Sequence, residues 1–212
     1  METENDAQAA IKPPAPLYVV VDTETGGLYA AKHSLLSICF IIVDKDLNTL
    51  DEFDHKILPR DGYSVEPRAA EINGYTEAEW ADKAKGFDHL QADRTFTKHL
   101  DQWFPAAMAG TGKQIVAVAH NATFDQGFVG HHLPETFKRL HSTWICTMWG
   151  LRQWRKRTGT EGKAKLSDLA DLSGFDFKAA AHTSKTDTQA CLHGWRWLVA
   201  QAKQAQPIAP TV

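Results

Sequence analysis

Cysteine is scarce in this sequence, and its placement argues against a disulfide scaffold. The 212 residues include three cysteines, Cys39, Cys146 and Cys191, which are widely spaced and form no CxxC pair. Small secreted domains depend on an even set of cysteines, and structural zinc sites need clustered Cys and His ligands. We therefore expect buried, reduced thiols in a cytoplasmic protein, without a structural zinc ion.

Long hydrophobic runs are also missing. The longest nearly apolar run, residues 35–43, has nine residues and contains Ser37, whereas a helix that spans a bilayer needs about 20. The acidic segment METENDAQAA at the N-terminus has no apolar stretch followed by a cleavage site, so no secretory signal is indicated. We expect neither a membrane protein nor an exported one.

Neither sign of charge dominates the chain. The net charge is −3 and the isoelectric point is near 6.4, so bulk charge does not attract a polyanion. Hydrophobic residues make up 43% and charged residues 23%, which is ordinary for a globular protein and excludes wholesale disorder. Any binding of nucleic acid must therefore be local.

The chain lacks repeats and linkers rich in Gly, Ser or Pro, which predicts one compact domain over residues 17–203. Residues 1–16 and 204–212 have few large apolar side chains and are predicted to be flexible tails. Hydrophobic patterns predict strands at 17–21, 35–43, 49–58, 115–119 and 143–148, and helices from 67 and 76, around 96–104, and at 124–133, 166–172 and 186–202. Three early strands followed by alternating strands and helices predict an α/β fold, a mixed β-sheet with helices on both faces.

Asp22 and Glu24 lie two residues apart at the end of the first predicted strand. Residues with this spacing project from the same face of a strand. Two like charges there repel unless a cation lies between them. The alternative is that both carboxylates face water in a loop.

Asp125 follows the predicted strand at 115–119 and shares a helix face with Val129 and His132. A carboxylate on a partly apolar face needs a partner. The alternative is an exposed acid that interacts with the dipole of the helix from its first turn.

Asp187 shares its helix face with Cys191 and further apolar residues, so it should point inward. The alternative is a capping box with Ser184. His182 precedes Asp187 in a loop of small residues that could bring an imidazole beside the acids. Because the chain has ten histidines, a surface role for His182 is the alternative.

The segment 151–166 is strongly basic, with six cationic side chains against Glu161. Trp149 and Trp154 lie nearby, so the segment is typical of phosphate contacts with base stacking. The alternative is a solvated, mobile loop. The cations are Arg152, Arg155, Lys156, Arg157, Lys163 and Lys165.

Three segments together resemble a known family: Val20 to Gly27 with the letters VVDTETGG, His120 to Asp125 with HNATFD, and His182 followed after four residues by Asp187. In order and spacing they resemble the three motifs of the DEDDh branch of DnaQ-like 3′→5′ exonucleases. Residues 165–169 are similar to the helix before the third motif in proofreading epsilon subunits. The resemblance spans residues 18 to about 200.

This resemblance implies an RNase H-like fold and two Mg²⁺ or Mn²⁺ ions held by Asp22, Glu24, Asp125 and Asp187. Two such ions about 3.5–4 Å apart can stabilise the attacking water and the departing 3′-oxygen. His182 occupies the position of the family's general base, and an imidazole can exchange a proton near neutral pH.

The family match also suggests residues that contact the substrate. Thr25, Gly26 and Leu28 would meet the terminal nucleotide, although ordinary packing is an equal alternative for Leu28. Asn121, beside His120, would bind the scissile phosphate or hold its own loop. In the basic segment, the proposed phosphate contacts are Arg155, Lys156 and Arg157.

We therefore expect a metal-dependent 3′→5′ exonuclease that releases nucleoside 5′-monophosphates from ends of single-stranded DNA. RNA is a competing substrate, because discrimination depends on 2′-hydroxyl contacts that a sequence does not reveal. A noncatalytic nucleic-acid-binding or polymerase-tethered module is the alternative, which the intact acid and histidine set argues against. The sequence shows no recognisable polymerase domain or clamp-binding tail, and leaves open action alone, as a homodimer or with a polymerase partner.

Overall fold

The computed structural model describes residues 17–85, 87–103, 115–177 and 183–205. The predicted N-terminal tail and most of the predicted C-terminal tail lie outside these ranges, as does His182. The last helix extends to Gln204, one residue into the predicted C-terminal tail.

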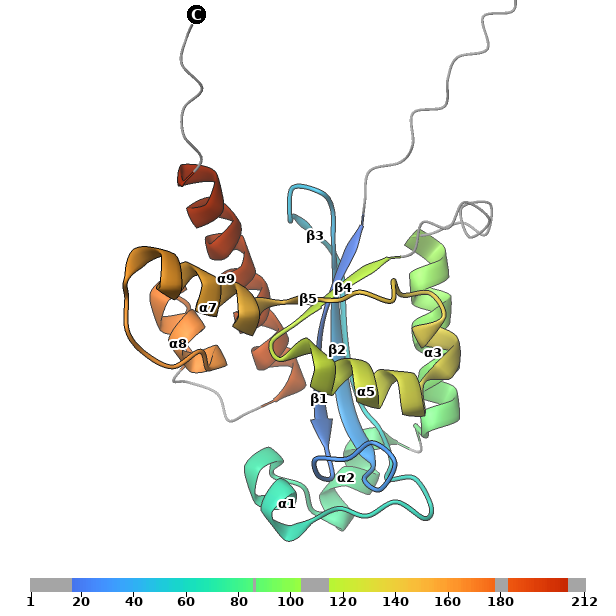
Figure 1. Ribbon diagram of the computed structural model, residues 1–212. Helices are drawn as coiled ribbons and strands as arrows, with labels where there is room; N and C mark the ends of the chain where they lie inside the picture. Colours follow the sequence, from blue (N-terminus) through green and yellow to red (C-terminus); the bar gives the residue numbers. More distant parts are fainter. Residues whose placement is uncertain (1–16, 86, 104–114, 178–182, 206–212) are drawn as a thin grey trace, which may run out of the picture.

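A five-stranded mixed sheet forms the centre of the molecule (Figure 1). Its strand order is β3-β2-β1-β4-β5, in which β1 pairs antiparallel with β2 and parallel with β4. The remaining pairs are antiparallel β2–β3 and parallel β4–β5. The strands are β1 (Tyr18–Thr25), β2 (Leu35–Val43), β3 (Thr49–Lys56), β4 (Val116–Ala119) and β5 (Ile145–Cys146). The predicted α/β fold with a mixed sheet is confirmed.

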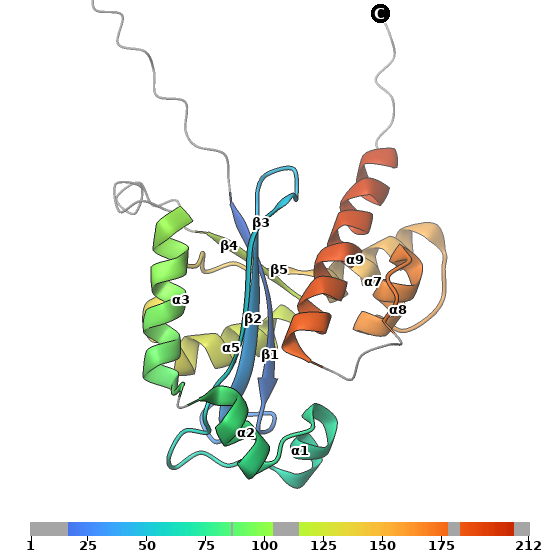
Figure 2. The same cartoon turned by 180° about the vertical axis from the view of Figure 1, so that it is seen from behind.

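Helices cover both faces of this sheet, as Figures 1 and 2 show from opposite sides. On one face α3 (His89–Trp103) and α5 (Ala122–His132) pack over a core that includes Val19, Val21 and Phe96. On the other face lie α7 (Thr147–Thr158), α8 (Leu166–Ser173) and α9 (Ser184–Gln204). Every residue of β2 is buried, because both faces of this strand are covered.

Shorter helices complete the fold. Helices α1 (Pro67–Asn73) and α2 (Glu77–Ala84) lie beyond the C-terminal end of β1, and α6 (Pro134–Phe137) follows α5. Gly74 ends α1 in a left-handed conformation, with φ of 65°, which glycine adopts at little cost. In the described part of the chain, no helix is long and apolar enough to cross a membrane.

One predicted strand is much shorter than expected, and one alternative is wrong. The strand expected at 143–148 has only two residues, because α7 begins at Thr147. The basic segment is not a loop over residues 152–157, which belong to α7. Arg, Lys, Gln and Leu all favour helices, and the first helix-ending residue after them is Gly159, with φ of 69°.

The cysteines are free, as expected, but differ in burial. Cys39 and Cys191 are buried, whereas Cys146 is half-buried, so the prediction of burial is confirmed for two of the three. Burial raises the pKa of the Cys39 thiol to about 12, which leaves it protonated and unreactive at neutral pH.

Candidate active site

Three acids meet at the C-terminal end of β1. Asp22 and Glu24 project from the sheet face that α9 covers, and Asp187 lies in the first turn of α9. One ligand oxygen from each lies within 4.8 Å of the others. Glu24 is buried and Asp22 half-buried, both inside a strand, so a water-facing loop is excluded for this pair.

Asp125 approaches the same strand from α5. Its side chain is 2% exposed, and its Oδ1 accepts hydrogen bonds from the Thr23 amide at 3.1 Å and the Thr23 hydroxyl at 2.9 Å. Thr23 lies between Asp22 and Glu24, so Asp125 is held against the centre of the acidic motif. The alternative of an exposed acid in the first turn of the helix is wrong.

The acids suppress one another's ionisation. Burial raises the pKa of Asp22 well above its ordinary value, and the charges of Asp125, Asp187 and Glu24 raise it further. Burial also raises the pKa of Asp125 to about 7, against the hydrogen bonds from Thr23. A divalent cation would offset this repulsion, and a donor set made only of carboxylate oxygens suits Mg²⁺ or Mn²⁺. The residues therefore fit the metal ions that the family resemblance implies.

Asp187 does not form a capping box with Ser184. The N-cap of α9 is Thr183, whose hydroxyl accepts from the Thr186 amide at 3.2 Å. His182, the expected general base, lies immediately before Thr183 and outside the described residues. Its role stays a prediction.

His120 connects the second motif to the neighbouring elements. Its Nδ1 lies 3.0 Å from the Thr147 hydroxyl, and its Nε2 lies 3.0 Å from the Ala164 carbonyl. Because a carbonyl can only accept, Nε2 donates, and a neutral ring then accepts at Nδ1. Burial lowers the pKa of His120, in keeping with the neutral form. These contacts favour an anchoring role for this ring over direct contact with substrate.

Asn121 is the N-cap of α5 and has a left-handed conformation, with φ of 67°, which asparagine tolerates better than most residues. Its side chain is exposed and makes no capping hydrogen bond to α5. The exposed side chain is therefore available for a contact outside its own helix. A contact with the scissile phosphate stays a prediction.

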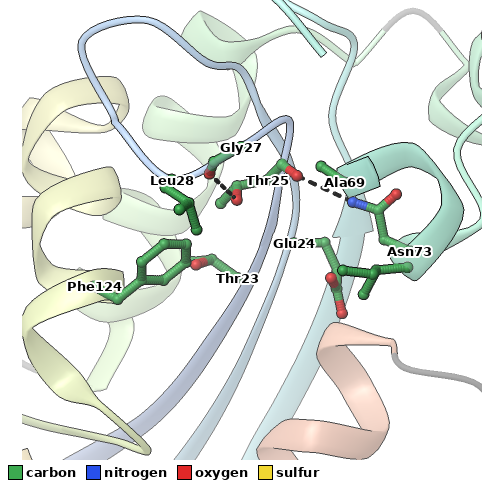
Figure 3. A pocket seen from close by; sticks show the side chains of 9 residues that line it. Thr23, Glu24, Thr25, Gly27, Leu28, Ala69, Asn73 and Phe124 are labelled. Atoms are coloured by element: carbon green, nitrogen blue, oxygen red, sulfur yellow. Dashed lines mark hydrogen bonds between the residues drawn. The ribbon is translucent and has the colours of Figure 1, made fainter. Parts of the chain in front are cut away.

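A pocket of about 190 Å³ opens beside Glu24 (Figure 3). Leu28 and Phe124 lie on one side of it, and Ala69 and Asn73 lie on the other. Leu28 is 70% exposed, so ordinary core packing does not explain it. The full lining is Thr23, Glu24, Thr25, Gly27, Leu28, Ala69, Ile72, Asn73 and Phe124.

Two hydrogen bonds shape the upper part of the pocket (Figure 3). The Thr25 hydroxyl donates to the Gly27 carbonyl at 2.7 Å, and the Asn73 amide donates to the Thr25 carbonyl at 3.1 Å. Gly26 packs closely against the backbone at Ser64. A Cβ at position 26 would lie 2.5 Å from the Ser64 carbonyl oxygen. The need for glycine at this position therefore comes at least in part from the fold.

Helix α1 supplies a wall of the pocket that the sequence motifs do not predict. Ala69, Ile72 and Asn73 belong to a helix with no buried residue, so its pattern does not reveal what it faces. The signal that could have found it is Ile72, the one large apolar side chain of this short helix, which is 55% exposed in the structure. Phe124 lies inside the second motif and could have been singled out as a wall residue.

The predicted basic contacts divide into engaged and exposed side chains. The Arg155 guanidinium donates to the Glu161 carbonyl and is half-buried. Lys156 and Arg157 are exposed at the end of α7. This helix starts beside His120 and points away from β1 (Figure 1), so the exposed pair lies on its distal end.

The two tryptophans of this region differ in the same way. Trp154 packs edge-on against Trp197, with ring centroids 4.8 Å apart, and its indole nitrogen lies 3.3 Å from Gln201 Oε1. Trp149 is 58% exposed. Only Trp149 of this pair is therefore free to stack on a base without rearrangement.

A family model described as Exonuclease matches residues 19–193, which is most of the chain. The chain belongs to the DnaQ-like family of 3′→5′ exonucleases. The family expected from the three sequence motifs is confirmed.

Curated relatives place this domain within much longer proteins. The PolC-type DNA polymerase III of Lactococcus lactis is 36% identical over 112 residues, which cover 53% of this chain and 6% of that protein. The PolC-type enzyme of Streptococcus agalactiae is 34% identical over 122 residues, which cover 55% of this chain and 7% of the relative. The chain thus corresponds to a small part of these polymerases.

Solved structures of exonuclease I share the fold. Escherichia coli exonuclease I in complex with a dT13 oligonucleotide superposes with a TM-score of 0.70 at 16% identity, over 89% of this chain and 42% of that one. Exonuclease I from Methylocaldum szegediense superposes with a TM-score of 0.67 at 18% identity, over 90% of this chain and 41% of that one. The RNase H-like exonuclease fold is confirmed.

Proposed function

We propose that this exonuclease degrades single-stranded DNA from the 3′ end and releases nucleoside 5′-monophosphates with the help of two divalent cations. The observation that carries the proposal is the meeting of Asp22, Glu24 and Asp187 beside a pocket with an exposed apolar wall. Carboxylate oxygens suit divalent cations, which would in turn contact the reacting phosphate, and the apolar wall suits a base.

Asp22, Glu24, Asp125 and Asp187 would hold the cations, either Mg²⁺ or Mn²⁺. When bound, two ions stabilise both the attacking and the departing oxygen during in-line phosphodiester hydrolysis. Asp125 commits its Oδ1 to Thr23, so its Oδ2 is the oxygen available to a metal. The Thr23 contacts fix the orientation of this carboxylate before any ion binds.

His182 would take a proton from the attacking water. The proposal is supported by its place next to Thr183, which caps the helix that carries Asp187. The water oxygen forms the new bond to phosphorus as the bond from phosphorus to the 3′-oxygen breaks. The phosphate stays on the released nucleotide as a 5′-monophosphate.

The terminal nucleotide would enter the pocket beside Glu24. Leu28 and Phe124 would contact one face of its base, with Ala69 and Ile72 opposite. Thr25 and Gly26 would lie near its sugar, and Asn121 near the scissile phosphate. A base can enter such a pocket only when it is unpaired, and apolar contact with bases is tolerant of sequence. This favours a single strand over a duplex end.

Exposed cations of α7 would contact phosphates further along the strand. Lys156 and Arg157 are free to do so, and Arg155 would have to leave the Glu161 carbonyl. Such contacts position the polymer without reading its bases. For the wider context, the PolC-type relatives favour a polymerase partner, with action alone or as a homodimer as the other outcomes.

The test is cleavage of matched 5′-labelled single strands of DNA and RNA by the purified protein, with and without Mg²⁺. We expect a ladder that shortens from the 3′ end, depends on Mg²⁺ and forms faster on DNA. Faster cleavage of RNA would identify RNA, and not DNA, as the preferred substrate. Cleavage in excess chelator would overturn the metal-dependent mechanism. Binding without cleavage under all conditions would favour the noncatalytic module.

A further inference from the structure

A chain of hydroxyl groups fastens the first turn of α9 to the sheet. The buried Ser184 hydroxyl donates to Asp54 Oδ1 on β3 at 2.9 Å, and the Ser37 hydroxyl on β2 lies 3.0 Å from Ser184 Oγ. A serine hydroxyl has a single hydrogen, which Ser184 gives to Asp54. Ser37 must therefore donate to Ser184, so the hydrogen bonds run in one direction, from Ser37 through Ser184 to Asp54.

The position of this chain relative to the acids is specific. Ser37 lies directly opposite Glu24 in the pairing of β1 with β2, and Ser184 precedes Asp187 by one helical turn. The two serines therefore form the contact between the strand next to Glu24 and the helix that carries Asp187.

A second contact lies on the other side of Asp187. The Thr188 hydroxyl donates to the Ser184 carbonyl at 2.6 Å and lies 3.4 Å from the carbonyl of Cys39. Cys39 is the residue opposite Asp22. The helix thus touches β2 on both sides of Asp187, each time beside a strand position that pairs with an acid.

The hydroxyl groups between α9 and β2 are fully buried. Ser37, Ser184 and Thr188 are all 0% exposed. Their small side chains permit a close approach of α9 to the sheet, and buried polar groups with satisfied hydrogen bonds favour one arrangement over its alternatives. Packing of apolar side chains alone would hold the helix with less control of its position along the strand.

We propose that Ser37, Ser184 and Asp54 form a positioning device that sets the distance of Asp187 from Asp22 and Glu24. None of the three belongs to the acidic cluster or to the lining of the pocket beside Glu24, so each would act through Asp187. The proposal rests on the proposed metal-binding function, because a fixed distance between these carboxylates matters only if they share ions.

A neighbouring ion pair provides the control. Lys185 also ties the first turn of α9 to β3, through Glu52 at 2.7 Å, but its side chain is 51% exposed. Exposed pairs of this kind contribute little to stability. Loss of Lys185 removes an anchor of the same turn without touching the buried hydroxyl chain.

The experiment is Mn²⁺ titration of the full chain without DNA, followed by electron paramagnetic resonance, for wild type, Ser184→Ala, Ser37→Ala, the double variant and Lys185→Ala. We expect Ser184→Ala to weaken Mn²⁺ binding about tenfold, as is common for residues that orient metal ligands, and to change the spin coupling between the ions. The double variant should lose little more than Ser184→Ala, because the serines act as one unit. Lys185→Ala should bind as wild type does.

Binding and coupling by Ser184→Ala that match wild type would overturn the positioning proposal, as would an equal loss in Lys185→Ala. Should Ser184→Ala fail to fold, Ser37→Ala carries the same expectation and the same contrary result. If wild type itself binds no Mn²⁺, the metal-dependent function is wrong, which is distinct from a failure of the positioning device.

Discussion

The acids around β1 and the cations at the end of α7 are both clusters of like charge, but they differ in burial. Asp125 is 2% and Glu24 9% exposed, whereas Lys156 and Arg157 lie in solvent. Exposed like charges are screened by water and salt at little cost. At the acidic site, burial first and then the charges of Asp125, Asp187 and Glu24 raise the pKa of Asp22. A divalent cation would therefore relieve the repulsion among the acids, whereas the exposed cations at the end of α7 need no anionic partner.

The largest effect should come from removing one acid of the cluster. We expect Asp22→Ala or Asp187→Ala to abolish turnover while the fold persists, because the change removes a metal ligand and relieves repulsion between carboxylates. Cleavage assays at limiting Mg²⁺ measure the first effect, and calorimetry in chelator measures the second. Near wild-type cleavage by either variant would contradict the metal cluster.

A smaller loss is expected for the proposed base. His182→Ala should lower the cleavage rate by roughly 10²–10⁴-fold, the usual contribution of general acid–base catalysis. Mn²⁺ binding should be retained, since this side chain is not among the proposed ligands. An unchanged rate would remove His182 from the mechanism.

On the basic side, the effect should appear in affinity. Changing both Lys156 and Arg157 to Gln should make the plot of log affinity against log salt shallower by about 1.4, from roughly 0.7 per phosphate contact on a single strand. The matched control is Arg155→Gln, which should change the slope less because the Glu161 carbonyl holds that side chain. Titrations in Ca²⁺, chosen to support binding without efficient cleavage, give the slopes. An unaltered slope in the double variant would assign the pair to the solvated surface.

The smallest effect concerns stability and pH. Burial raises the pKa of Asp125 from 3.8 to about 7, so the folded protein keeps a proton that the unfolded chain loses between these values. Wild type should therefore lose stability relative to Asp125→Asn as the pH rises from 5 to 7.5 without metal. The comparison is needed because buried His132, with a pKa lowered to about 4, gives the opposite slope over part of this range. Thermal unfolding of both proteins in chelator measures the difference in stability between them at each pH. A difference that does not change with pH would contradict the raised pKa of Asp125.

Sequence patterns predicted the sheet and the acids because both depend on local regularities. Hydrophobic runs mark β1 and β2, and the motifs mark Asp22, Asp125 and Asp187. The wall formed by α1 was not predicted, because Ile72 and Asn73 carry no motif. They lie beside the pocket only because the chain after Gly26 folds back over the end of β1. The hydroxyl chain from Ser37 to Asp54 was not predicted either, since it joins residues brought together by strand register and helix docking.

The direct test of whether the four acids share divalent cations is an anomalous difference map from crystals of the wild-type protein soaked in Mn²⁺. We predict two peaks among Asp22, Glu24, Asp125 and Asp187 in the wild-type crystals. Crystals of Asp187→Ala soaked in the same way should show no peak of wild-type occupancy there. A wild-type map with no peak among these carboxylates would contradict the account.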